Sequence, residues 1–241
     1  SPWIDRDWAR VSGLPLEDVS FSATDGTSLF GWYVESSATA AVLLWCHGNA
    51  GNIIHRLDNL AMLYRLGLSV FLFDYRGYGR SRGSPSEEGL YQDALGAYGY
   101  LTGTRRIRPD RLVLFGRSLG AAVAGEVARQ RATAGLILES AFPSVEALAR
   151  PHYFGLPVHW LLGARFNLTD RLQQISVPIL FVHGDRDTIV PIQLGKQVFD
   201  SAHEPKSFYV VHGADHNDLY LVGGKPYFQR VKRFVEEVMS R

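Results

Sequence analysis

The sequence predicts an α/β fold in which helices cover both faces of a mostly parallel central sheet. Short apolar runs rich in β-branched and aromatic residues alternate along the chain with longer segments of helical period. This alternation is typical of strands that are joined by helical crossovers. The 241 residues, of which 46% are hydrophobic and 20% charged, are enough for one large core. We therefore expect a single domain over residues 1–241.

The apolar runs divide into buried strands and an edge hairpin. Runs with the length and bounding turns of strands buried on both faces are Ala41–Cys46, Ser69–Asp74, Leu112–Phe115, Leu136–Leu138, Ile179–His183 and Phe208–Val211. Two further runs, Val19–Ser22 and Ser28–Val34, flank the turn residues 24–27 and predict an antiparallel hairpin at one edge of the sheet.

Helical segments lie between these strands. The expected helices are Ile53–Leu66, Ser86–Leu101, Leu119–Gln130, Ile192–Ser201 and Pro226–Met239. The second has a clear start signal, in which Ser84 caps the helix, Pro85 takes its first position and Glu87 completes a capping box.

The most informative motif is G-x-S-x-G at residues 116–120, which places Ser118 between a predicted strand and an alanine-rich predicted helix. This context is that of a nucleophile elbow, a sharp turn that exposes the serine hydroxyl. The flanking glycines let strand and helix pass closely, and the helix N-terminus favours developing negative charge. The motif predicts that Ser118 is a nucleophile. The alternative is a glycine-rich turn with an incidental serine.

A serine hydroxyl needs a base to remove its proton, and His216 is the best candidate among the eight histidines. It follows the last predicted strand, in a loop at the carboxyl edge of the sheet, where Ser118 is also expected. His212 lies at the end of that strand and is expected to pack or cap there. His183 precedes a turn and is expected to order it.

The base needs an acid that fixes its tautomer and stabilises its protonated form. Asp187 is the candidate, because it ends a loop after the predicted strand Ile179–His183 and the chain then leads into a helix. Asp185, in the same loop, is expected to brace it. Glu139, just past another predicted strand, is the alternative acid.

Backbone N–H groups are expected to bind the oxyanion of a tetrahedral intermediate. The segment 47–52 directly follows the predicted strand Ala41–Cys46, and the expected donors are the N–H groups of Asn49 and Leu119. The glycine-rich segment 74–81, which begins with Asp74, is expected to be a structural loop behind them rather than part of the chemistry.

Residues 142–174 interrupt the alternation with three prolines, Pro143, Pro151 and Pro157, and many aromatic side chains. The segment is too long for an ordinary connection in a compact α/β domain. It predicts a small inserted lid whose Phe142, Phe154 and Trp160 contact the substrate. The alternative is that these side chains are the lid's own packing.

Charge, cysteine content and the length of apolar runs argue against a nucleic-acid partner, an intrachain disulfide and a transmembrane helix. The net charge is +1, with 25 basic and 24 acidic residues, so no basic face for nucleic acid is indicated. One cysteine, Cys46, allows no intrachain disulfide and leaves the compartment open. No stretch reaches the roughly 18 uninterrupted apolar residues of a transmembrane helix.

Together, the segments 47–52, 74–79, 116–120, 184–187 and 215–217 resemble one branch of the α/β-hydrolase superfamily. This branch contains small, often membrane-associated serine hydrolases, among them protein depalmitoylases and monoacylglycerol or lysophospholipid lipases. The resemblance extends from about Leu14 to the C-terminus. It implies the α/β-hydrolase fold, a triad in the order Ser118, Asp187 and His216, and oxyanion donors at Asn49 and Leu119. Members often carry an N-terminal hydrophobic anchor, which makes membrane association through an upstream segment a hypothesis.

The expected function is hydrolysis of carboxylic esters or thioesters through an acyl-enzyme, with a small or lipid-like substrate that carries a hydrophobic acyl group. Neither a metal ion nor an organic cofactor is implied, and nucleic acid is not an expected partner. Two alternatives are a catalytically silent ligand-binding protein and a membrane-docked interaction protein on the same fold.

Overall fold

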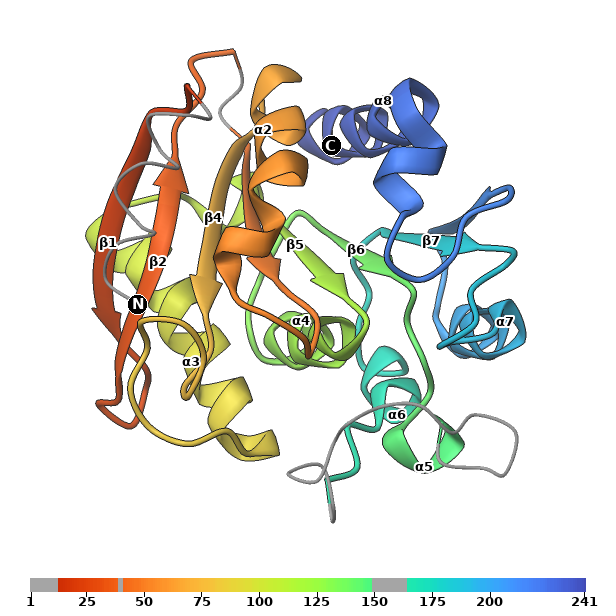
Figure 1. Ribbon diagram of the computed structural model, residues 1–241, viewed down its shortest axis with the longest axis horizontal. Helices are drawn as coiled ribbons and strands as arrows, with labels where there is room; N and C mark the ends of the chain where they lie inside the picture. Colours follow the sequence, from red (N-terminus) through yellow and green to blue (C-terminus); the bar gives the residue numbers. More distant parts are fainter. Residues whose placement is uncertain (1–12, 39–40, 149–163) are drawn as a thin grey trace.

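The computed structural model describes residues 13–38, 41–148 and 164–241. They contain an eight-stranded sheet with the strand order β1-β2-β4-β3-β5-β6-β7-β8 (Figure 1). The strands are β1 (Leu16–Ser22), β2 (Ser28–Val34), β3 (Val42–Cys46), β4 (Ser69–Asp74), β5 (Leu112–Arg117), β6 (Gly135–Glu139), β7 (Ile179–Gly184) and β8 (Lys206–Val211). β2 pairs antiparallel with both β1 and β4, and every other pairing is parallel. The mostly parallel sheet and the edge hairpin that the sequence predicts are therefore confirmed.

The described residues contain the five predicted helices, of which the last begins earlier than expected, and two short helices, α5 and α6, that were not predicted. They are α2 (Leu57–Arg65), α3 (Glu87–Gly99), α4 (Leu119–Gln130), α5 (Val145–Leu148), α6 (Leu168–Leu172), α7 (Ile192–Ser201) and α8 (Leu219–Met239). Short 3₁₀ turns, η1 (Ile53–Arg56) and η3 (Pro109–Arg111), precede α2 and β5, and a π-helical turn, η2 (Tyr100–Thr104), extends α3. α8 continues across a break at Gly224, whose φ of 47° is not helical, and the predicted helix at Pro226 begins just beyond this break. No helix in the described part of the chain combines the length and apolarity needed to cross a membrane.

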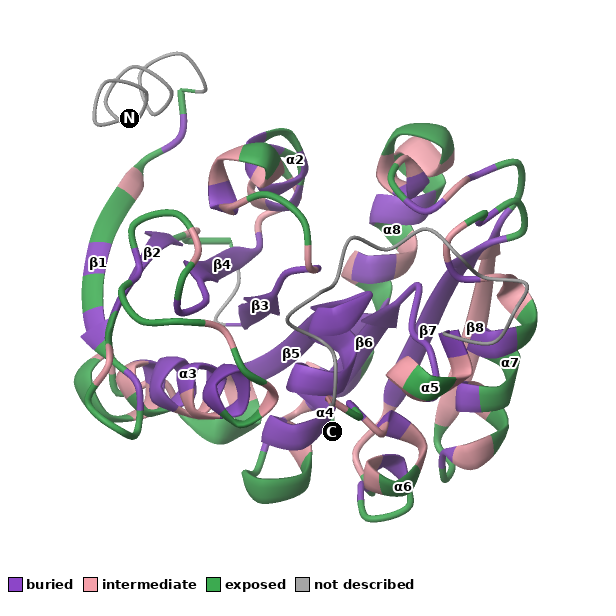
Figure 2. Ribbon diagram, turned by 60° about the horizontal axis from the view of Figure 1, so that its bottom comes forward, coloured by how far each residue is buried: buried purple, intermediate pink, exposed green. Residues whose placement is uncertain are grey.

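Helices cover both faces of the sheet (Figures 1 and 2). The alternation of side chains along the strands divides the core into two layers. Leu44 and Leu114 point into the layer formed with α3, α4 and α6. Trp45 and Phe115 point the other way, where their stacked rings lie 5.2 Å apart and pack with α2 and α8. Because both faces are buried along β3–β7, these strands read in the sequence as continuous apolar runs. β8 lies at the edge of the sheet and is only half-buried, so the prediction that Phe208–Val211 is buried on both faces is wrong.

The predicted cap of α3 is wrong. The helix begins at Glu87, and the cap is Ser86, whose hydroxyl accepts a hydrogen bond of 3.1 Å from the N–H of Gly89. Glu87 does not complete a capping box with Ser84. Its carboxylate instead accepts hydrogen bonds from the N–H groups of Arg165 (2.6 Å) and Phe166 (2.9 Å). The local pattern predicts that the Glu87 carboxylate caps the start of α3. In the structure this carboxylate instead binds residues 165 and 166, which are distant in sequence.

The described parts of the 142–174 segment include α5 at its start and α6 near its end. Both helices lie at the bottom of the view in Figure 1. Phe142 is 3% exposed and belongs to the core layer formed with α4 and α6. Phe154 and Trp160 lie outside the described residues.

Candidate active site

The topology brings several loops together at one edge of the sheet. From β3 the chain moves to β4 on one side, and after α3 it returns to β5 on the other side of β3. In open α/β sheets, ligands bind at such a switch point, outside the carboxyl ends of the strands. Asn49 follows β3, Ser118 follows β5, Asp187 follows β7 and His216 follows β8. All four therefore lie in loops that leave this edge.

Ser118 occupies a strained turn between β5 and α4. Its φ of 53° and ψ of −120° are rare for a residue with a side chain, and such strain is typical of functional sites. The flanking glycines make the turn sterically feasible. A Cβ atom at Gly120 would lie 2.0 Å from the carbonyl oxygen of Cys46, and one at Gly116 would lie 2.4 Å from that of Gly120. Larger residues at these two positions would push β3, β5 and α4 apart.

The side chains of Ser118, His216 and Asp187 form one hydrogen-bonded row. Ser118 Oγ lies 3.1 Å from His216 Nε2, and His216 Nδ1 lies 2.8 Å from Asp187 Oδ2. All three residues are buried, with exposed fractions of 8%, 6% and 6% for Ser118, Asp187 and His216. The three residues that the sequence singled out are therefore in mutual contact, in an arrangement able to transfer a proton from the serine.

The loop after β7 holds the carboxylate of Asp187 in place. Asp187 Oδ1 accepts hydrogen bonds from the N–H groups of Ile189 (3.0 Å) and Val190 (2.6 Å), so Oδ2 is left to face His216. His183 Nε2 donates a hydrogen bond of 2.7 Å to the Val190 carbonyl. Burial lowers the pKa of His183, which keeps its imidazole neutral. His183 thus orders this turn, as the sequence predicts.

Asp185 braces the loop, also as expected. Its Oδ1 accepts a hydrogen bond of 2.7 Å from the N–H of Gly213, and its Oδ2 lies 2.8 Å from His212 Nδ1. The hydrogen bond to His212 lowers the pKa of the Asp185 carboxyl. His212 was expected to pack or cap at the strand end; its side chain is 85% exposed, so it does not pack there. The His212 imidazole lies at the surface, where it contacts the Asp185 carboxylate.

The loop after β3 lies against the elbow. A Cβ atom at Gly48 would lie only 3.5 Å from the Cβ of Ser118, so the neighbouring Asn49 is close to the nucleophile candidate. The side chain of Asn49 accepts a hydrogen bond of 2.7 Å from the hydroxyl of Tyr78. Leu119 is the first residue of α4, where N–H groups lack intrahelical partners. The loop that carries Asn49 and the first residue of α4, Leu119, therefore both lie next to Ser118 or to a residue in contact with it.

His47, at the start of the same loop, is a structural residue. It is fully buried, and burial lowers the pKa of its imidazole to about 3. Its ring lies 4.5 Å from that of Tyr75, and its Nδ1 donates a hydrogen bond of 2.7 Å to the Gly48 carbonyl. A neutral, packed His47 fixes the path of the loop that carries Asn49.

The segment 74–81 supports the same loop, in agreement with its predicted structural role. Asp74 accepts hydrogen bonds from the N–H groups of Ile53 (3.0 Å) and Arg80 (3.2 Å). Tyr75 donates a hydrogen bond of 3.2 Å from its hydroxyl to the His47 carbonyl. These contacts fasten β4 to the segment between β3 and α2.

Glu139, the alternative acid, is bound elsewhere. Its carboxylate is fully buried, accepts a hydrogen bond of 2.5 Å from the hydroxyl of Tyr227 and lies 3.2 Å from Arg117 Nε. Arg117 in turn donates a hydrogen bond of 2.5 Å to the backbone carbonyl of His216. Of the two candidate acids, Asp187 is the one in contact with the imidazole.

Two residues at the site were not singled out by the sequence. Arg117 occupies the variable position directly before Ser118, and Asp215 directly precedes His216. Asp215 Oδ1 accepts hydrogen bonds of 2.7 Å from the N–H groups of both Thr188 and His216, which joins the acid loop to the base loop. The hydrogen bond from Thr188 lowers the pKa of the Asp215 carboxyl. The signal in the sequence that could have identified Arg117 and Asp215 is that each directly precedes a residue of the Ser-His-Asp row.

A groove of about 800 Å³ runs between α2 and α8, two helices that both begin at the edge of the sheet where Ser118 lies. Its apolar lining includes Leu57, Ala61 and Met62 of α2 and Tyr220, Leu221 and Phe228 of α8. Leu221 is 64% exposed and Met62 36%, and the exposed side chains of Asp58, Arg65, Lys225 and Gln229 complete the rim, which is therefore partly apolar and partly charged.

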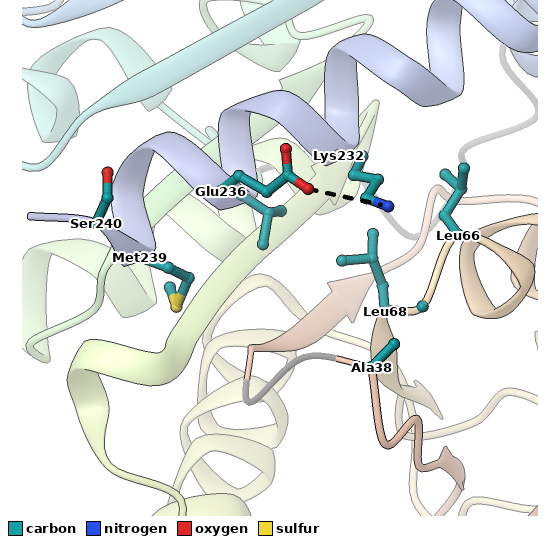
Figure 3. Close-up of a pocket in the computed structure, with 9 residues that line it drawn as sticks. Ala38, Leu66, Leu68, Lys232, Glu236, Met239 and Ser240 are labelled. Carbon is teal, nitrogen blue, oxygen red and sulfur yellow. Dashed lines mark ion pairs between the residues drawn. The ribbon is translucent and has the colours of Figure 1, made fainter.

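A smaller cavity of about 310 Å³ lies far from the site (Figure 3). It is lined by Leu68, which precedes β4, and by residues near the C-terminal end of α8, including an ion pair of 3.9 Å between Lys232 and Glu236. This is the amino edge of the parallel strands, opposite to Ser118. Among the described residues, no group of three or more His, Cys, Asp or Glu side chains could hold a metal ion.

The fold, together with the Ser-His-Asp row at the carboxyl edge of its sheet, defines an α/β hydrolase. Residues 37–167 match the model of the family described as serine aminopeptidase, S33. The chain belongs to this family of α/β hydrolases.

Similar proteins agree with this assignment. The chain is 41% identical over 229 residues to the uncharacterized protein Rv2307c of Mycobacterium tuberculosis, covering 94% of this chain and 82% of that protein. It is 38% identical over 197 residues to the lysophosphatidylserine lipase ABHD12 of Danio rerio, covering 73% of this chain and 51% of that protein. The esterase Pf2001 of Pyrococcus furiosus superposes with a TM-score of 0.81 at 20% identity, over 95% of this chain and 92% of that one, and thus shares the fold.

Proposed function

We propose that this α/β hydrolase is a serine esterase or thioesterase that works through an acyl-enzyme, with Ser118 as nucleophile, His216 as base and Asp187 as the acid that orients it. The observation that supports the proposal most is the row of contacts from Ser118 Oγ to His216 Nε2 (3.1 Å) and from His216 Nδ1 to Asp187 Oδ2 (2.8 Å), starting from a strained elbow. The lipase and esterase names of a relative and a structural neighbour agree with it.

In the proposed reaction, Ser118 Oγ attacks the acyl carbonyl carbon while His216 Nε2 accepts the hydroxyl proton. Asp187 keeps the Nδ1 proton directed at its carboxylate and stabilises the imidazolium. The N–H groups of Asn49 and Leu119 bind the oxyanion of the tetrahedral intermediate. The intermediate collapses, His216 returns the proton to the departing alcohol or thiol, and an acyl-Ser118 ester remains. Water, activated by the same histidine, then hydrolyses this ester.

We further propose a hydrophobic acyl group. The groove of about 800 Å³ between α2 and α8 supports this part of the proposal, because it has apolar lining residues and both helices begin at the edge of the sheet where the serine lies. None of the three triad residues lines this groove. Each methylene of a substrate that leaves water in such a groove contributes about 0.8 kcal/mol. We also propose that residues 142–174 form a lid, with Phe154 and Trp160 as its candidate substrate contacts. Phe142, the third candidate from the sequence, packs in the core instead.

The test combines a covalent probe with a substrate panel. A fluorophosphonate should label the chain at Ser118, and Ser118→Ala should abolish labelling without unfolding the protein. p-Nitrophenyl esters from acetyl to palmitoyl, together with one acyl thioester, should be hydrolysed, with kcat/KM increasing toward longer chains. A chain that is neither labelled nor active on any member of the panel would be a silent ligand-binding protein, and the proposal would be wrong. Labelling that mapped to Ser140 or Ser144 would contradict the assignment of Ser118.

A further inference from the structure

Arg117, the residue directly before Ser118, is buried, with only 5% of its side chain exposed. Its Nε lies 3.2 Å from Glu139 Oε1, and its Nη2 donates a hydrogen bond of 2.5 Å to the backbone carbonyl of His216. A second, longer contact of 3.4 Å reaches the side-chain oxygen of Asn217. One guanidinium group therefore links the elbow to the loop of the proposed base, 99 positions further along the chain.

The acid that holds Arg117 is itself fixed. Glu139 is fully buried at the end of β6, and its other oxygen accepts a hydrogen bond of 2.5 Å from the hydroxyl of Tyr227, a fully buried residue of α8. A buried arginine requires such a counter-charge, since an unpaired charge in the interior is strongly unfavourable. The planar guanidinium presents several donors in fixed directions, so it can bind a carboxylate and a carbonyl at once.

The backbone of His216 is held from both sides. Its N–H donates a hydrogen bond of 2.7 Å to Asp215 Oδ1, which is tied to Thr188, and its carbonyl accepts the hydrogen bond from Arg117. With the backbone fixed, the position of Nε2 relative to Ser118 Oγ depends only on the two side-chain torsions of the histidine. The contact between His216 and Asp187 restricts those torsions.

We propose that Arg117 is a positioning residue for His216: through its hydrogen bond to the His216 carbonyl, and anchored by Glu139 and Tyr227, it keeps the imidazole within reach of the Ser118 hydroxyl. This inference rests on the proposed function, because it concerns the placement of the base in that reaction. It assigns to Glu139, the alternative acid in the sequence, the task of anchoring Arg117 rather than contacting the imidazole.

The experiment compares Arg117→Ala with the wild-type chain on p-nitrophenyl acetate. We expect kcat to fall by about 10- to 100-fold, the range reached when a reacting group is misplaced by about 1 Å, while KM stays within about twofold. The rate of fluorophosphonate labelling at Ser118 should fall by the same factor. Guanidinium or methylguanidinium ions at non-denaturing concentrations should fill the vacated space and restore kcat, whereas sodium chloride at equal ionic strength should not.

Arg117→Lys tests the geometry without removing the charge, and it carries the test if the alanine variant does not fold. A lysine ammonium can pair with Glu139 but lacks the planar fork, so we expect kcat to fall by at least about 10-fold in a folded protein. Arg129→Ala is the control. Arg129 also pairs with a mostly buried glutamate, Glu126 (2.6 Å), but at the far end of α4, and Arg171 continues to hold that glutamate. The kcat of Arg129→Ala should equal that of the wild-type chain.

Unchanged kcat in either folded Arg117 variant, or a loss in Arg117→Ala that guanidinium does not restore, would overturn the assignment of Arg117. Failure of the proposed function gives a different result, because the wild-type chain would then be neither labelled at Ser118 nor active on the ester.

Discussion

Replacement of Asp187 by asparagine tests the proposed acid. The two oxygens of Asp187 have different partners: Oδ1 accepts hydrogen bonds from the N–H groups of Ile189 (3.0 Å) and Val190 (2.6 Å), and Oδ2 faces His216 Nδ1 at 2.8 Å. In Asp187→Asn, the amide oxygen is expected to stay with the two N–H donors, because the amide nitrogen cannot accept from them. The amide NH₂ then faces His216 and donates to Nδ1.

The consequence is the wrong tautomer of His216. An imidazole that accepts at Nδ1 carries its proton on Nε2, so it cannot accept the proton of Ser118. The loss seen when a triad acid no longer selects the tautomer is about 10⁴-fold in kcat, equivalent to about 5.5 kcal/mol of transition-state stabilisation. The fold should change little, because the amide keeps both loop hydrogen bonds.

The assay is turnover of p-nitrophenyl acetate, with the labelling rate at Ser118 as a second measurement and thermal unfolding as a check of the fold. Glu139→Gln is the comparison, and we expect it to cost far less in kcat because Glu139 acts only through Arg117. A loss of less than about tenfold in Asp187→Asn, or a larger loss in Glu139→Gln, would refute the reasoning and require the triad to be redrawn through Glu139.

Two further predictions concern acid stability and the lid. Burial lowers the pKa of His47 to about 3, below its value of 6.5 in the unfolded chain, so the unfolded state binds a proton that the folded state does not. Stability should therefore decrease as pH falls below 6.5, by about 1.4 kcal/mol per pH unit from this residue, with His183 acting in the same direction. In urea unfolding at pH 6.5 and 5, His47→Gln should show a smaller loss than the wild type, and equal losses would contradict this. The double change of Phe154 and Trp160 to alanine should flatten the acyl-chain-length profile while acetyl-ester turnover stays nearly constant. A uniform loss would mean that the segment supports the fold, and an unchanged profile would mean that it does not contact the substrate.

Local signals in the sequence were sufficient for most of the secondary structure. The predicted helices Leu119–Gln130 and Ile192–Ser201 coincide with α4 and α7, and the hairpin turn at residues 24–27 joins β1 and β2 as expected. Turn residues and hydrophobic period act over a few neighbouring positions, so the linear pattern contains them. The cap of α3 was misplaced because Ser84 and Ser86 carry the same short-range capping signal.

The sequence also singled out Ser118, Asp187 and His216 before any geometry was known. Each lies in a loop directly after a recognisable strand, and in a parallel sheet the carboxyl ends of all strands meet at one edge. The motif around Ser118 has an additional steric signature, since Gly116 and Gly120 sit where β3, β5 and α4 leave no space for a Cβ atom.

Only the tertiary structure decided which of two chemically suitable acids contacts His216. Glu139 and Asp187 are both acids that follow strands, and the sequence left both open as the partner of His216. The strand order places Asp187 against the imidazole, while Glu139 contacts Arg117 and Tyr227, the latter 88 positions further along the chain. Such pairings depend on how strands distant along the chain are arranged side by side. That arrangement is set by packing across the whole core, which no local stretch of sequence specifies.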